Sequence, residues 1–186
     1  MLALLAMLAA IPATAADVVL TGGAFGAGYG PPLHSLAALL GFVAIGLWSG
    51  LLGGGTVWQF PALAIAAALG ASYAFESGFA LPYAQQGLMA VPVVIGVMIV
   101  LGLRLPLLSP PVVVVLAGVF EGHALVAVAG SPHLVPWAGF GAAALLATAG
   151  GLGLAVIVSS APLALGVRAL GAGAVAAGVL MLLDKL

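Results

Sequence analysis

The stretch that decides the fold is GYGPPLHSLAALLGFVAIGLW, residues 28–48. It holds a Pro-Pro pair, then His34, and then an uncharged apolar run that ends on Trp48. A titratable side chain therefore stands where a hydrophobic segment begins, and we expect His34 to open a helix there. The rest of the chain follows the same plan, with long apolar segments that carry a few polar groups near one end.

Composition places the whole chain in a lipid bilayer. Of its 186 residues 65% are hydrophobic and 4% are charged, whereas a soluble domain carries about 25% charged residues. The mean hydropathy is +1.40. The net charge of −1 argues against nucleic acid as a partner, and the lack of cysteine excludes disulfides and thiolate metal sites. We expect no enzyme, since no nucleophile–base pair or zinc motif stands at helical spacing.

The apolar segments predict the fold class. Each approaches the roughly 20 residues that cross a hydrocarbon core, and such long unbroken runs favour helices over the strands of a barrel. We predict an all-α polytopic bundle in one domain, residues 17–186, in which 17–32 form a glycine-rich loop. The six transmembrane helices are expected near 33–52, 57–75, 84–103, 110–130, 134–158 and 161–183.

The N-terminal residues 1–16 have the pattern of a signal peptide, with an apolar core and a small-residue cleavage pattern. An uncleaved short membrane segment is the alternative. With the new N-terminus outside, the loops next to Arg104 and Arg168 face the cytoplasm, in line with the positive-inside tendency. The 28 glycines predict close helix packing and are compatible with a homo-oligomer or a larger membrane complex.

Polar groups from three predicted helices lie at similar depth near the outer face. They are His34, the pair Gln85 and Gln86, and the intramembrane Glu121 and His123. Ionisable residues inside a membrane usually face a bundle interior or a wet cavity, so we expect one shared, hydrated opening. Glu121 and His123 are about 200° apart around a helix and do not share a face. The alternatives are structural hydrogen bonds for these two residues and capping or anchoring roles for the others.

The chain resembles the HupE/UreJ family of bacterial inner-membrane proteins, which are proposed nickel or cobalt permeases linked to hydrogenase and urease maturation. The resemblance covers nearly the whole chain. It rests on the signal-like start, Gly46-Leu47-Trp48, the stretch from Leu81-Pro82 to Gly96, Leu103-Arg104-Leu105-Pro106 and Phe120-Glu121-Gly122-His123-Ala124.

The family's ligand motifs are only partly present. The first motif, a histidine followed after five residues by Asp-His, falls on Pro31, Ala37 and Ala38. In the second motif, Phe-His-Gly-His-Ala-His-Gly, Glu121 and Leu125 replace the flanking histidines. His123 alone carries over directly. A family glutamate near the start of the third helix falls on Gln85.

Two functions follow as hypotheses. The resemblance implies an inner-membrane permease for Ni²⁺ or Co²⁺. From the polar residues themselves we take His34, Glu121 and His123 as its candidate metal ligands, with Gln85 and Gln86 lining a periplasmic site. Imidazole and carboxylate ligands suit these ions. In the alternative, the chain is a metal-independent accessory or structural subunit that packs against a larger membrane complex. The missing Asp-His pair favours the alternative. The resemblance favours the permease, but fold resemblance does not determine function.

Overall fold

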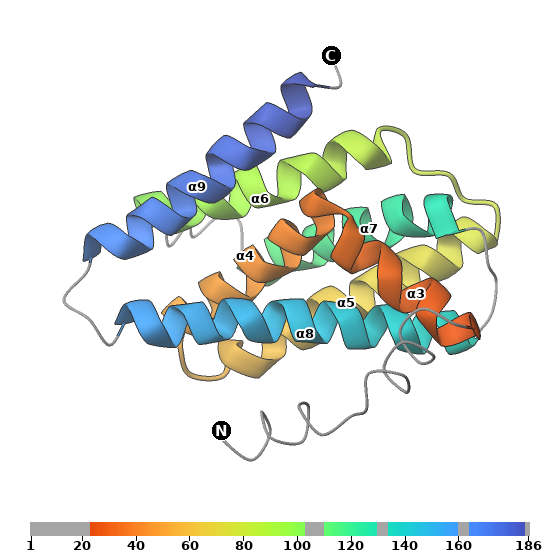
Figure 1. Ribbon diagram of the computed structural model, residues 1–186, viewed down its shortest axis with the longest axis horizontal. Coiled ribbons are helices and arrows are strands. Elements are labelled where there is room, and N and C mark those ends of the chain that lie inside the picture. The colour runs from red at the N-terminus through yellow and green to blue at the C-terminus, as the bar shows by residue number, and fades with distance from the viewer. Residues whose placement is uncertain (1–22, 103–109, 130–133, 160–163, 185–186) are drawn as a thin grey trace.

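A computed structural model describes residues 23–102, 110–129, 134–159 and 164–184 (Figure 1). Every regular element in these ranges is an α-helix, which confirms the all-α prediction. The helices are α3 (Gly23–His34), α4 (Leu36–Leu52), α5 (Thr56–Glu76), α6 (Ala84–Leu101), α7 (Pro110–Ala129), α8 (Leu134–Ser159) and α9 (Ala164–Leu183). The signal-like residues 1–16 lie outside the described residues, as do Arg104 and Lys185.

The helices have the length and apolar character of membrane spans. Among the described residues four meet both criteria by themselves: α5, α6, Trp137–Ser159 of α8 and Leu165–Leu183 of α9. The pair α3 and α4 meets them jointly but is bent by 82° at its break, and α7 contributes a shorter apolar stretch, Pro110–Leu125. The chain is therefore a helical membrane protein.

The prediction of a loop at 17–32 is wrong for residues 23–32, which belong to the helix α3. Glycine and proline disfavour a helix, yet α3 packs along α8, where Gly139 allows the Phe25 backbone to approach closely. Tertiary packing thus overrides local propensity. The break comes later, at Ser35, whose extended backbone and side-chain oxygen cap the start of α4. His34 therefore ends α3 rather than opening the next helix.

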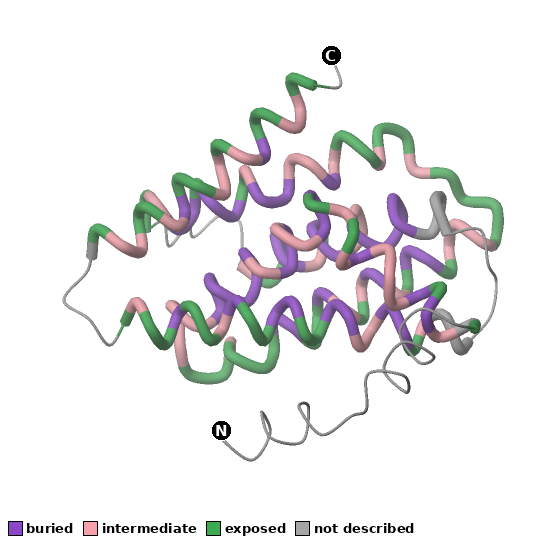
Figure 2. The backbone as a smooth tube through the Cα atoms, in the orientation of Figure 1, coloured by how far each residue is buried: buried purple, intermediate pink, exposed green. Residues whose placement is uncertain are grey.

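The central helix is α4, which contacts each of the other six described helices. The most extensive pairs are α5 with α7, α4 with α8, α6 with α9 and α3 with α8 (Figure 1). Figure 2 shows buried residues concentrated along α4 and on the inward sides of its neighbours. By contrast, only 11% of the membrane-length stretch of α9 is buried, because α9 packs mainly on α6.

Glycines stand where the helix backbones approach most closely. A side chain at Gly46 would meet the Thr148 backbone of α8, and one at Gly122 would meet the Ala68 backbone of α5. Such contacts between small residues and backbone are a common way for helices to associate in lipid. They bring α8 against α4 and α5 against α7, and so position the polar residues of α7.

Candidate functional site

A cavity of about 560 Å³ lies where α3 ends and α4 begins. Residues of α3, α6 and α7 and the break residue Ser35 form its wall: Gly26, Ala27, Gly30, Pro31, His34, Ser35, Gln85, Leu88, Ala124 and Leu125. The polar side chains in this wall are those of His34, Ser35 and Gln85. The chain bends by 82° between α3 and α4, and His34 and Ser35 at this bend both belong to the cavity wall.

Two of the predicted site residues share this cavity. His34 is exposed at the last position of α3. Gln85, in the first turn of α6, is also exposed, and its side-chain amide donates a hydrogen bond of 3.2 Å to the Ala124 carbonyl of α7. That bond orients the glutamine at the α6–α7 side of the cavity. Gln86 is exposed and does not belong to the lining.

Glu121 is fully buried, with 0% exposure, and does not line the cavity. Its carboxyl group lies against Gly41 of α4, and the Val91 side chain of α6 borders the same space. Neither carboxyl oxygen has a hydrogen-bond partner. A buried polar group without a partner is costly, so this acid is the strongest single indication of function in the described chain.

His123 faces a different neighbour. Its Nε2 atom accepts a hydrogen bond of 2.7 Å from the backbone N–H of Leu81, in the connection between α5 and α6. The rings of Phe75 and Phe79 meet the imidazole edge-on, with centroids 5.0 Å and 6.5 Å away. These contacts hold the α5–α6 connection on α7, and the hydrogen bond from Leu81 occupies the Nε2 lone pair that a metal ion would need.

The four polar side chains do not converge on one opening, which corrects the expectation from sequence. His34 and Gln85 share the cavity, whereas Glu121 points towards α4 and His123 towards α5. The physical reason is the angle of about 200° between positions two residues apart on a helix. Within the described ranges no group of three or more His, Asp or Glu side chains is placed to hold a metal ion.

Two features near the acid were not singled out from the sequence. Gly41 makes room for the carboxyl group of Glu121. Leu88 and Leu125 lie in the cavity wall, and both are buried. The sequence signal for Gly41 is weak, because it is one more glycine in an apolar run, and Leu88 carries no signal among so many leucines. Leu125 stands out only as the residue at the position of a family histidine.

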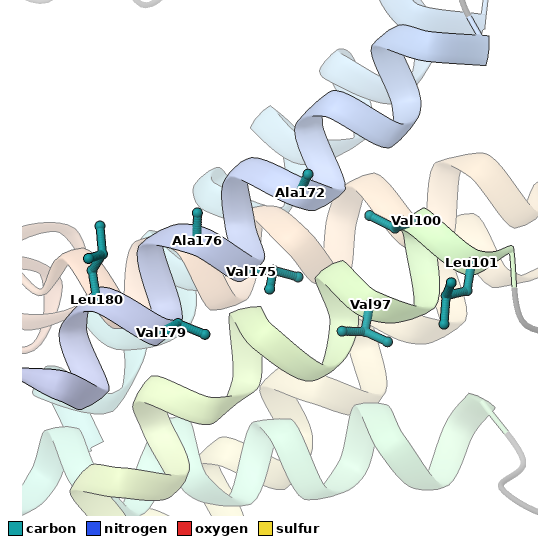
Figure 3. A pocket seen from close by; sticks show the side chains of 8 residues that line it. All are labelled: Val97, Val100, Leu101, Ala172, Val175, Ala176, Val179 and Leu180. Atoms are coloured by element: carbon teal, nitrogen blue, oxygen red, sulfur yellow. The ribbon is translucent and has the colours of Figure 1, made fainter.

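A second hollow, of about 630 Å³, lies between α6 and α9 (Figure 3). Its lining is entirely aliphatic: Val97, Val100, Leu101, Ala172, Val175, Ala176, Val179 and Leu180. No lining side chain can coordinate an ion or form a hydrogen bond. This groove therefore suits hydrocarbon, and the polar cavity at the α3–α4 break remains the candidate site.

Comparison with known proteins gives one family and one relative. The profile described as HupE / UreJ protein matches residues 3–181. The protein named Protein HupE, from Rhizobium leguminosarum bv. viciae, is 28% identical over 97 residues, which are 52% of this chain and 51% of that protein. The match thus spans about half the length of the curated relative. No solved structure matches the chain.

Proposed function

Because the chain belongs to the HupE/UreJ family, we propose that it is a secondary permease for nickel(II) or cobalt(II) in the bacterial inner membrane. The observation that carries the proposal is the pairing of a polar cavity with a buried acid. The cavity holds His34 and Gln85, and the carboxyl group of Glu121 lies without a partner on a helix that also lines the cavity.

The proposed roles follow from ligand chemistry. The imidazole of His34 is the first nitrogen ligand at the periplasmic mouth, and the amide oxygen of Gln85 assists it. Glu121 supplies the negative charge that a divalent ion needs inside the membrane. His123, expected from the sequence to be a third ligand, is assigned a positioning role, because its Nε2 atom is already hydrogen-bonded. A site with so few ligands binds weakly, which suits an ion that must also leave.

The test is nickel uptake in cells that lack other nickel permeases. We expect His34→Ala and Glu121→Gln to abolish uptake at equal protein levels. Gln86→Ala is the matched control, since Gln86 is exposed beside Gln85 but lies outside the cavity wall. Unchanged uptake in both site variants would rule out this route for the ion.

A metal-independent accessory subunit is the second candidate. The observation that favours it is that the described residues hold no three-ligand cluster. Reconstitution separates the two functions. Purified protein in vesicles should accumulate nickel by itself if it is a permease. Vesicles that stay empty, together with copurification of a larger membrane complex from cells, would favour the accessory function.

A further inference from the structure

We propose that Leu88 of α6 and Leu125 of α7 form a closed hydrophobic gate between the polar cavity and the carboxyl group of Glu121. The inference rests on the proposed transport function, to which it adds a closed step on the ion path. Both leucines belong to the cavity wall, and their exposures are 3% and 4%. They face the cavity on one side and are packed in the bundle on the other.

Helix geometry places the acid directly beneath this part of the wall. Glu121 lies four residues before Leu125, on the same face of α7 and about 6 Å further from the cavity. On α6, Val91 lies three residues beyond Leu88, and its side chain borders the same space beside Gly41 that the Glu121 carboxyl group enters. Because α6 runs away from the cavity and α7 runs towards it, both helices put the acid one turn below the wall.

The position of Gly41 on α4 leads to the same depth for the acid. Ser35 lines the cavity at the start of α4. Gly41, against which the carboxyl group of Glu121 lies, is six residues further along, roughly 9 Å at the rise of an α-helix. The positions on α4, α6 and α7 therefore all place the acid below the level of the cavity.

Side-chain direction makes the leucine of α7 a cover for the acid. Helical side chains lean towards the N-terminus of their helix, and the N-terminus of α7 lies away from the cavity. The side chain of Leu125 therefore leans over Glu121, while the Glu121 carboxyl group leans deeper into the bundle. The result is an aliphatic layer between water and the acid, and a layer of this kind stops ions by excluding water.

The acid also gives a reason for the layer to open. Its oxygens lack hydrogen-bond partners, and each such buried group carries a penalty that water or an ion would remove. Rotation of the leucine side chains would bring the carboxyl group into contact with the cavity without breaking any backbone hydrogen bond. The structure describes the closed state, and the proposed open state differs from it in the rotamers of these two leucines.

The chain is suited to a cysteine-accessibility test, because it has no cysteine of its own. Full-length Glu121→Cys in lipid nanodiscs is treated with a water-soluble, positively charged methanethiosulfonate reagent. We expect it to react slowly in the parent background. Adding Leu125→Ala or Leu88→Ala should raise the rate by about tenfold, which corresponds to about 1.4 kcal/mol off the barrier.

Two controls calibrate the rates. Ser35→Cys lies in the cavity wall and should react fast in every background. Leu146→Ala is the matched leucine control: it lies on α8, is 49% exposed and belongs to none of the described cavity walls, so it should leave the rate at position 121 unchanged.

Either of two results would overturn the gate. Position 121 could react as fast as Ser35→Cys with both leucines intact, or its rate could stay low when either leucine is shortened. If Leu125→Ala does not fold, Leu88→Ala and the milder Leu125→Val give the same readout. Reactivity is measured without metal, so a failed gate leaves the uptake test of His34→Ala standing, and a confirmed gate does not depend on it.

Discussion

The carboxyl group of Glu121 lies against the backbone of Gly41, in the space that any side chain at position 41 would fill. This is where α7 meets the central helix α4, which it otherwise contacts little. The glycine and the acid therefore form one unit. Whatever changes the size or charge at one position changes the packing at the other.

Gly41→Ala should destabilise the protein by about 1–3 kcal/mol, the usual range for overpacking. The added methyl group would collide with the carboxyl group of Glu121 and press on Val91. Thermal unfolding in detergent measures the loss. Gly173→Ala is the matched control, because a side chain there meets nothing within 4 Å.

The same pair predicts a rescue. Glu121→Ala removes the group that the new methyl would strike, so the double variant with Gly41→Ala should be more stable than the sum of the single effects. Couplings between residues in contact are about 0.5–3 kcal/mol. Strict additivity would show that the two side chains do not share this space.

Replacing the acid with an apolar side chain should stabilise the fold. Glu121→Met keeps most of the volume and removes two oxygens that have no partner, so we expect a gain of about 1–3 kcal/mol. Uptake of nickel should be lost in the same variant. A lower unfolding temperature would mean that the carboxyl group has a stabilising partner, such as a bound water.

The two histidines should behave in opposite ways. His123→Ala removes the acceptor of the Leu81 N–H and the edge contact to Phe75, so we expect a loss of about 1–3 kcal/mol and faster amide exchange at Leu81. Uptake by the folded fraction should persist. His34→Ala should give the reverse, with uptake lost and stability nearly unchanged, since His34 is exposed. Normal stability of His123→Ala with no uptake would instead make His123 a ligand.

Gly122→Ala should separate α7 from α5. An added methyl group would strike the Ala68 backbone, and the Ser72 hydroxyl, which donates a 3.2 Å hydrogen bond to the Gly122 carbonyl, would lose its geometry. We expect less folded protein in detergent, measured by size-exclusion chromatography. Gly70→Ala on α5 is the control, because its added side chain meets nothing, and an equal loss there would point to a general effect of alanine.

The sequence by itself determined that the protein lies in a lipid bilayer and that its fold class is all-α. Lipid offers no partner for an unpaired backbone group, which restricts spanning segments to helices or closed barrels, and unbroken apolar runs of about 20 residues favour helices. The sequence also showed the small number of charged residues, the resemblance to a family and the positions of the polar residues along the chain. The angle that separates Glu121 from His123 followed from their spacing, before any contact was known.

Only the tertiary structure decided which neighbours those residues face. Local propensity placed a loop at 23–32, yet packing on α8 makes it a helix and moves the break to Ser35. The cavity at that break, the glycine against the acid and the two leucines of the cavity wall come from four helices, α3, α4, α6 and α7. Helix rotation and crossing position set such meetings, and both depend on the sum of all contacts rather than on any one segment.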